Sequence, residues 1–434
     1  MLLLGLTGAG ALALWHWQHD RVVWVMLAAG VVYAVAAWAV WRHADAQDAA
    51  AQRRGLLLIL IAAGAARCLL VAAPPVSTDI YRYVWDGRVQ AAGINPYRYR
   101  PADEQVGFLR DAAVYPHINR AATAVTIYPP FAQMVFLGVT RIADSVTGMK
   151  AAMVGFEALT VAALLALLRS RGLSGNRVLL YAWHPLPAFE FAGSGHVDAL
   201  AIALMVLACW LAERRRPLTA GALLGAATAV KFFPAVIAPA LYRRWGWRLP
   251  TALLAVFIAL YLPYAGVGWR VLGFLPAYAQ EEGLANGNGY FILNALNAVI
   301  ALPPWITAAY LLAGGLLLTR LSWAAVMRRR PDRISLTSAL VLLTAFTVWV
   351  SPHLAWYFTW IIPFLCFTPS WALVYLSAAA PLLYAIIWAP GDVPLHAALY
   401  GPFAGLLALD WWSGSRRSPL EFSDDGSLRS RHAG

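Results

Sequence analysis

Long apolar runs separated by short polar segments make up most of this chain. Many of the runs hold about 17 to 22 residues, enough for a helix to cross a hydrocarbon core about 30 Å thick. Because backbone polar groups inside a bilayer must be satisfied within their own segment, we expect these runs to be helices. The pattern predicts an all-α polytopic membrane protein with about 12–14 transmembrane helices, at residues 2–18, 22–41, 56–73, 150–168, 178–192, 197–212, 218–230, 232–242, 249–266, 304–326, 334–350, 353–367, 370–389 and 394–412.

Three stretches depart from this simple pattern. Residues 127–143 and 290–302 are apolar, but each begins beside a long polar loop and contains polar residues. We expect both of them to lie along the membrane surface instead of crossing it. The two runs on either side of Lys231 are short, and they are either two half-helices or two full crossings.

The positions of arginine decide between the possible topologies. If 127–143 and 290–302 do not cross, one side receives 21 arginines, in segments 42–55, 169–177, 213–217, 243–248, 320–333 and 413–434. The short segments of the other side hold only Arg21, Lys231 and Arg270. Short cytoplasmic segments carry the excess of positive charge in membrane proteins, so we expect both termini in the cytoplasm. The long loops 74–149 and 267–290 then face outward.

Composition narrows the class of protein further. Hydrophobic residues make up 61% of the 434 positions and charged residues 12%, whereas a soluble domain has about 25% charged residues. The net charge of +12 comes from the cytoplasmic arginine clusters, so it does not indicate nucleic-acid binding. We expect two extra N-terminal helices in 1–55, a main membrane module in 56–367 that includes loop 74–149, C-terminal helices in 368–412 and a disordered cytoplasmic tail in 413–434.

Polar residues gather where the apolar runs reach the outer face. They come from five segments, beginning with STDIYRYVWDGRVQAAGINPYRYR, and they are Asp79, Arg82, Asp86, Arg88, Tyr128, Glu190, His196, Asp198, Lys231 and His353. Each has a simpler explanation alone: Lys231 can extend to the interface, and a single histidine such as His353 is more often a packing residue. Ionisable groups at the edge of a membrane usually line a cavity or pathway. Their convergence on one face indicates a transfer site in which acids accept protons and cations hold a phosphate.

The same segments resemble a known group of enzymes. The stretches STDIYRYVWDGRVQAAGINPY, YRYRP, IYPPFAQ, WHPLPAFEFAGSGHVDAL, VKFFPAV and SPHLAWYFTWIIP are similar to the successive motifs of GT-C glycosyltransferases. They most resemble mannosyltransferases that use polyprenyl- or dolichyl-phosphate mannose, over roughly residues 56–367. The resemblance implies a GT-C-like bundle in a bacterial-type inner membrane, with surface helices on its first outer loop. It also implies transfer with inversion from a lipid-phosphate sugar to an acceptor hydroxyl.

The resemblance further implies that an acid of the first outer loop is the general base, and Asp79 matches that acid. Many relatives have a second acid two residues later, where this chain has Tyr81, so we expect chemistry without a metal and without another cofactor. Asp86 is the alternative base, because it lies two helical turns further on the same helix face. We favour Asp79, which lies closest to the end of the third helix. We expect Asp86 to form an ion pair with the flanking Arg82 or Arg88 and to order the loop.

A lipid-phosphate sugar carries its own leaving group, so the enzyme must supply a base and fixed cations for the departing phosphate. The candidate cations are Arg82, Arg88, Lys231 and His353, and the further substrate-binding candidates are Tyr128, Glu190, His196 and Asp198. The expected partners are a polyprenyl-phosphate sugar, membrane lipids and a lipid, glycan or protein acceptor. Mannose follows from the resemblance alone. Two other functions stay open: a transporter or flippase of lipid-linked sugars, and a polysaccharide ligase or polymerase.

Overall fold

The computed structural model describes residues 2–16, 19–46, 48–242, 246–328, 333–388 and 393–416, and within these ranges it holds helices and no strand. Five of its helical stretches are long and apolar enough to cross a membrane: Arg21–Ala46, Ala49–Ala72, Val146–Ser170, Arg248–Glu281 and Trp305–Val326. The predicted all-α polytopic membrane fold is therefore confirmed. The predicted tail lies outside the described residues beyond Arg416.

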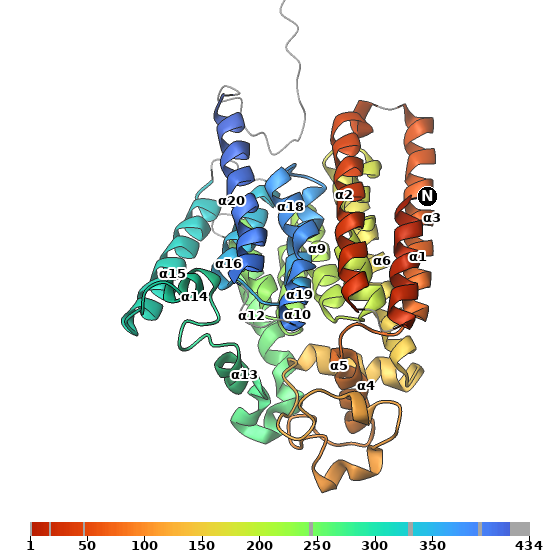
Figure 1. Cartoon of the computed structure of the whole chain (residues 1–434), viewed down its shortest axis with the longest axis vertical. Helices are drawn as coiled ribbons and strands as arrows, with labels where there is room; N and C mark the ends of the chain where they lie inside the picture. The colour runs from red at the N-terminus through yellow and green to blue at the C-terminus, as the bar shows by residue number, and fades with distance from the viewer. Residues whose placement is uncertain are drawn as a thin grey trace, which may run out of the picture.

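The longer helices form one bundle (Figure 1). They are α1 (Leu2–Trp15), α2 (His19–His43), α3 (Ala49–Ala72), α6 (Val146–Ser170), α9 (Asp198–Glu213), α10 (Pro217–Thr228), α12 (Arg248–Tyr261), α15 (Trp305–Val326), α16 (Leu336–Val350), α18 (Trp371–Ala379) and α20 (Val393–Arg416). Helix α9 is apolar on nearly all sides and almost wholly buried, as expected of a helix at the centre of a bundle. It packs against α6 and α10, and α10 packs against α12. The N-terminal helices join the same core, since the Tyr33 hydroxyl donates to the Leu180 carbonyl at 2.8 Å.

Several predicted spans are not single helices. The runs 178–192, 232–242, 353–367 and 370–389 are broken into η4 (Gly175–Val178), α7 (Leu179–Ala182), α8 (Pro185–Pro187), η5 (Ala188–Gly193), η6 (Phe233–Ile237), α11 (Ala238–Leu241), η8 (Ala355–Ile361), α17 (Ile362–Leu365) and α19 (Leu382–Trp388). Prolines within these runs remove backbone donors and explain the breaks. At Lys231 the helices agree with the half-helix interpretation, because α10 has 12 residues and η6 and α11 have 5 and 4, each too short for a full crossing.

The long loops gather at one end of the bundle, which we call the loop end (Figure 1). Its elements are α4 (Asp79–Ala91), η2 (Glu104–Leu109), η3 (Tyr115–His117), α5 (Pro130–Ile142), η7 (Leu262–Leu272) and α13 (Leu275–Glu281), while α14 (Phe291–Asn297) packs against α20. Helix α5 has 13 residues and spans about 20 Å, too short to cross a bilayer. It packs against α4 and α6, as a surface helix would.

Close packing fixes α4 on α5. A Cβ at Gly87 of α4 would overlap the Thr140 hydroxyl and lie 2.7 Å from the Phe136 carbonyl oxygen, so only glycine permits this approach. One turn earlier, the Tyr83 ring stacks on Phe136 at 4.5 Å. The orientation of α4, which carries Asp79, is thereby set by contacts with a second helix.

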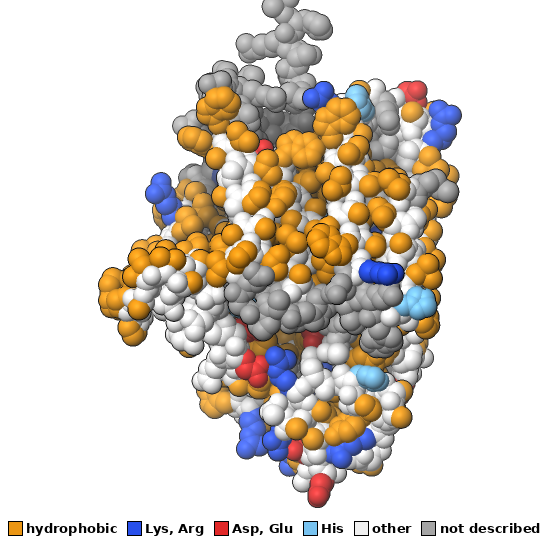
Figure 2. All heavy atoms as spheres, in the orientation of Figure 1, with side chains coloured by type: hydrophobic (Ala, Val, Ile, Leu, Met, Phe, Trp, Pro, Cys, Tyr) orange, Lys and Arg blue, Asp and Glu red, His pale blue; other side chains and the backbone are white. Residues whose placement is uncertain are grey.

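The two long loops also hold each other. The Phe274 amide donates to the Thr126 carbonyl at 3.0 Å, and the Tyr264 hydroxyl donates to Gln90 at 2.7 Å. Arg120 pairs with Glu281 at 2.8 Å across the two loops. Charged side chains cluster over this end, whereas apolar side chains form a broad band over the helices above it (Figure 2). The two long loops therefore form one polar layer that covers this end of the apolar bundle.

Segments predicted to be cytoplasmic meet at the opposite end. Arg177 pairs with Asp45, and Arg171 pairs with Glu213 at 2.8 Å. Arg171 also donates to the Ile334 carbonyl at 2.8 Å, just beyond segment 320–333. These contacts join segments 42–55, 169–177 and 213–217, which agrees with the grouping that the arginine count predicts.

Cysteine labelling tests which end faces outward. Gln105→Cys and Thr147→Cys place exposed thiols at the loop end, and Ala50→Cys places one at the opposite end. In a background without the three native cysteines, we expect an impermeant thiol reagent added to spheroplasts to label positions 105 and 147 but not 50. Labelling at 105 with protection at 147 would mean that the segment between them crosses the membrane. Labelling at position 50 alone would invert the topology.

Candidate active site

Asp79 stands at the start of α4, where the chain leaves the bundle. Pro74 and Pro75 follow the last residues of α3 and end that helix, because proline cannot donate the next backbone hydrogen bond. Asp79 is the first residue of α4 and is partly exposed. Its backbone amide donates to the Ser77 hydroxyl at 3.2 Å, and the Asn119 amide group donates to its carboxylate at 2.9 Å. The carboxylate is thus oriented and still accessible.

Asp86 has a different environment, although it lies on the same helix. It is buried, and Gln133 Nε2 donates to its carboxylate at 2.9 Å. Burial raises the pKa of the Asp86 carboxyl above its ordinary value, while the charge of Arg82 and hydrogen bonds from Thr126 and Gln133 oppose that rise. Asp86 therefore anchors α4 on the chain around α5, as expected of a residue that orders the loop.

The two arginines of α4 are engaged within the loop. Arg82 is buried and donates to the Ala124 carbonyl at 2.8 Å. Arg88 pairs with Asp111 and with Asp144, each at 2.7 Å. The expected pairing of Arg88 with Asp86 is wrong, because the Arg88 guanidinium reaches these two other acids. The charge of Arg82 is the one that acts on Asp86.

A second group of polar residues lies where α9 begins. Asp198, the first residue of α9, is fully buried and accepts from Lys231 Nζ at 2.7 Å and from the Trp360 indole at 2.9 Å. Lys231 Nζ also lies 4.9 Å from the centre of the Tyr357 ring. An acid at a helix N-terminus is favoured by the helix dipole, and the buried charge has a cationic partner. This ion pair joins α9, the break after α10, and η8.

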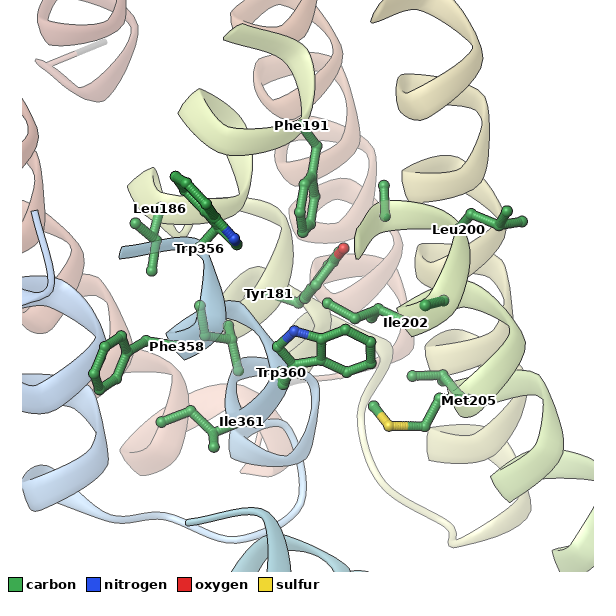
Figure 3. Close-up of a cluster of buried hydrophobic side chains, with 14 of the residues drawn as sticks. Tyr181, Leu186, Phe191, Leu200, Ile202, Met205, Trp356, Phe358, Trp360 and Ile361 are labelled. Carbon is green, nitrogen blue, oxygen red and sulfur yellow. The ribbon is translucent and has the colours of Figure 1, made fainter. Parts of the chain in front are cut away.

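Glu190 and His196 extend this group. Glu190 lies in η5, a π-helix, an element that is rare and often found at functional sites. Its carboxylate accepts from the Tyr384 hydroxyl at 2.6 Å and lies 3.4 Å from His196 Nε2. The His196 ring stacks on Trp356 at 4.1 Å. Trp356 and Trp360 lie among buried apolar side chains of α8, η5 and α9 (Figure 3).

Electrostatic interactions connect Asp79 to this second group. The negative charge of Asp79 acts on the Lys231 amine and on the His196 ring. It also forms a hydrogen bond with Tyr128, whose ring meets Tyr83 edge-on at 4.8 Å. The first long loop and the α9 region therefore contribute to one site.

His353 lies at the margin of this site and contacts the second long loop. Its Nδ1 lies 3.4 Å from the Glu282 carboxylate, and about a third of its side chain is exposed. Burial opposes ionisation of Glu282, but hydrogen bonds from His353 and Tyr278 and the charges of His353 and Arg120 prevail and lower its pKa. Tyr278 also hydrogen-bonds to Tyr357, the ring beside Lys231. A chain of polar contacts thus runs from Glu282 to Lys231.

The structure sorts the predicted residues into three sets. The first set comes together at one site and consists of Asp79, Tyr128, Glu190, His196, Asp198 and Lys231. The second set packs within the first long loop and consists of Arg82, Asp86 and Arg88. The third is His353 alone, which contacts the second long loop at the margin of the site.

Sequence reasoning missed several contributors. Trp356 and Trp360 are part of the motif SPHLAWYFTW, and their spacing of one helical turn was the available signal. Tyr83 lies one helical turn after Asp79, and this spacing could have placed the two residues on the same helix face. Asn119, Glu282 and Tyr384 reach the site only through the tertiary fold, and no local pattern marks them.

Comparison with known proteins shows which family the chain resembles in sequence. A family model described as alpha-(1->6)-mannopyranosyltransferase, N-terminal domain, matches residues 5–246, which include both N-terminal helices. The alpha-(1->6)-mannopyranosyltransferase A of Mycobacterium tuberculosis (strain ATCC 25618 / H37Rv) is 24% identical over 325 residues, which are 67% of this chain. The chain spans 61% of the length of that relative. No solved structure matches the chain.

The raised pKa of Asp86 predicts a pH-dependent stability. A carboxyl whose pKa is higher in the folded than in the unfolded state favours folding at low pH, and that contribution is lost as the pH rises through the folded pKa. Thermal unfolding of the wild type and of Asp86→Asn should therefore be compared from pH 3.8, the ordinary value for aspartate, up to pH 7. We expect the wild type to lose stability relative to the variant along this series. An equal offset at every pH would contradict the raised pKa.

Proposed function

Because the chain belongs to the alpha-(1->6)-mannopyranosyltransferase family, we propose that it is a membrane-bound mannosyltransferase. The donor is a polyprenyl-monophosphate mannose, and the acceptor is a hydroxyl of a lipid, glycan or protein. The loop end faces outward from a bacterial-type inner membrane, with both termini in the cytoplasm. Transfer with inversion then gives an alpha linkage from a beta-linked donor.

The observation that carries this proposal is the placement of the Asp79 carboxylate. It is partly exposed at the loop end, oriented by Asn119, and within electrostatic reach of Lys231. A carboxylate and an amine at the same edge of an apolar bundle are the two groups that transfer from a lipid phosphate requires. The apolar helices beside them suit the long tail of a polyprenyl donor.

Asp79 acts as the general base. It accepts the proton of the acceptor hydroxyl while the hydroxyl oxygen attacks the anomeric carbon of the sugar. The bond between that carbon and the phosphate oxygen breaks, and the polyprenyl phosphate leaves with the electron pair. Asn119 holds the carboxylate in place by donating to it. No covalent bond to the protein forms, because the phosphate is already a good leaving group.

Lys231 and His353 hold the departing phosphate. The phosphate gains negative charge in the transition state, so fixed cationic donors lower the barrier. Lys231 is kept in place by Asp198 and the Tyr357 ring, and His353 is kept in place by Glu282. We assign Arg82 and Arg88 to the ordering of the loop instead, since their guanidinium groups are engaged by the Ala124 carbonyl, Asp111 and Asp144.

The proposed reaction uses no metal ion. The position where many related enzymes have a second acid is Tyr81, whose ring lies 4.7 Å from that of His117. Two other acids of the site are also engaged: Asp198 by Lys231 and Trp360, and Glu190 by Tyr384. Tyr128, Glu190, His196 and Asp198 are buried, and their proposed role is to hold Asp79 and Lys231 in place for the donor.

A flippase is less well supported. It would require polar groups that form a path through the bundle. Of the ionisable residues deeper in the bundle, Arg67 pairs with Glu157 at 2.8 Å and donates to the Ala182 carbonyl at 2.6 Å, so its donors are used internally. A ligase or polymerase would instead take a donor with a pyrophosphate, and the choice of donor distinguishes it from a mannosyltransferase.

Replacement of Asp79 tests the base. In Asp79→Asn the carboxamide keeps the shape and loses the proton acceptor, so we expect kcat to fall by roughly 10²- to 10⁴-fold. The measurement is release of polyprenyl phosphate from labelled polyprenyl-phosphate mannose by purified protein, with a cell-envelope extract as acceptor, first without and then with a metal chelator. The control is Asp103→Asn, which removes an acid of the same loop that pairs with Arg100.

This assay distinguishes failure of the proposed mannosyltransferase activity from failure of the proposed role of Asp79. No consumption of the donor by the wild type would contradict the mannosyltransferase. An active wild type with an equally active Asp79→Asn would contradict only the base assignment. Loss of activity on addition of the chelator would contradict the reaction without metal.

Replacement of Lys231 or His353 tests the phosphate site. Loss of one electrostatic donor to a transition state costs about 10²- to 10³-fold in kcat, so Lys231→Met and His353→Ala should each lose activity by this order. Binding of polyprenyl phosphate alone should weaken in both, measured by protection against thermal unfolding. Near-normal turnover in Lys231→Met would mean that Lys231 does not hold the phosphate and only packs at the interface. The same result in His353→Ala would remove the histidine from the phosphate site.

A further inference from the structure

Lys150 is a buried amine that the proposed chemistry does not use. It lies near the start of α6, and only 1% of its surface is exposed. Its Nζ donates to the Leu70 carbonyl at 2.7 Å and to the Ala73 carbonyl at 2.5 Å. Both acceptors belong to the end of α3, so Lys150 ties the start of one long helix to the end of another.

The two prolines after α3 explain why this amine is required there. A helical carbonyl normally accepts from the amide four residues later, and for Leu70 and Val71 those residues are Pro74 and Pro75, which have no N–H. The Leu70 carbonyl accepts instead from the Ala73 amide, at 3.2 Å, and from Lys150. An amine donates in either protonation state, and the C-terminal end of a helix favours a positive group. Lys150 therefore gives the Leu70 carbonyl a donor in place of the amide that Pro74 lacks.

The stem of Lys150 contacts the other half of the site. Gly195 has φ +75°, in the left-handed region that favours glycine. A Cβ at Gly195 would lie 3.2 Å from Lys150 Cγ and would overlap Ile80 Cδ1. Gly195 directly precedes His196, and Ile80 directly follows Asp79. Lys150 thus lies between the two segments that carry the site.

We propose that Lys150 is a positioning residue that fixes Asp79 relative to His196 and Asp198. Its amine holds the last turn of α3, six residues before Asp79. Its stem supports the turn at Gly195 that leads into His196 and α9. Lys150 touches neither the reacting atoms nor the substrate, and its role rests on the proposed function of Asp79 as the base. Small displacements of a base from its substrate lower kcat more than they change KM.

The test replaces Lys150 by methionine, which keeps a stem of similar length and removes the donors. We expect Lys150→Met to lower kcat for mannosyl transfer at least tenfold with the KM for polyprenyl-phosphate mannose within about threefold. Hydrogen exchange at the backbone amides of residues 76–83 should become faster. Lys150→Arg, which keeps donors on a long stem, should retain more of the kcat than methionine does. The matched control is Arg177→Met, which removes a buried cation paired with Asp45 at the opposite end and should lower thermal stability without changing kcat.

The outcomes separate this inference from the proposed function. If the wild type transfers no mannose, the proposed function fails, and unchanged exchange at 76–83 in Lys150→Met would overturn the structural role as well. If the wild type is active and Lys150→Met keeps its kcat, the positioning role is wrong. Equal loss of kcat in Lys150→Met and Arg177→Met, in proportion to lost stability, would also overturn it. Should Lys150→Met not fold, Gly195→Ala keeps the amine and displaces the turn, and unchanged kcat in that variant would overturn the inference.

Discussion

A charge at the edge of an apolar bundle must have a partner, and the ion pair between Asp198 and Lys231 satisfies this constraint for the whole site. Asp198 is fully buried, so its carboxylate is stable only with Lys231 Nζ and the Trp360 indole as donors. Those donors come from two other segments, which are thereby held at the start of α9. The positions of Glu190, His196 and Tyr357 follow from that junction, since each lies on one of the joined segments or against it.

The long helices and the breaks between helices have different roles. The interiors of α3, α6 and α9 supply apolar packing, with a few internally paired charges such as Arg67 and Glu157. The residues with proposed chemical roles lie where helices stop: Asp79 follows the prolines after α3, Lys231 lies between α10 and η6, and His353 follows α16. Backbone that is not helical is tolerated at membrane depth only when protein covers it, and the small helices around α9 are almost wholly buried. The ends and breaks of the helices, many of them at prolines, are therefore the places where the residues with proposed chemical roles lie.

The sequence predicted those parts of the molecule that depend on local pattern. The long apolar runs were enough for the helical class, and the shortness of the runs around Lys231 indicated the break there, because each is decided within a short stretch. The surface placement of α5 stays a prediction. The sequence predicted which segments come together at the site, but not which residues of those segments contact each other. Nothing local indicates that Lys231 meets Asp198, 33 positions earlier, or that Tyr384 meets Glu190. Arg88 was misassigned for the same reason, since its partners Asp111 and Asp144 are brought to it only by the packing of α4 on α5.

The π-helix at Ala188–Gly193 has a consequence for how such a site can arise. A π turn holds one residue more than the α turn that it replaces, and Ser194 accordingly donates to the Phe189 carbonyl, five residues earlier, at 2.8 Å. Every side chain after an inserted residue is rotated by about a quarter turn or more around the helix axis relative to those before it. Glu190 lies inside this turn and His196 follows it, so their contact depends on the number of residues in the segment as well as on their identity. Loss of one residue from Ala188–Gly193 would therefore be expected to separate the pair even though every polar side chain of the site is kept.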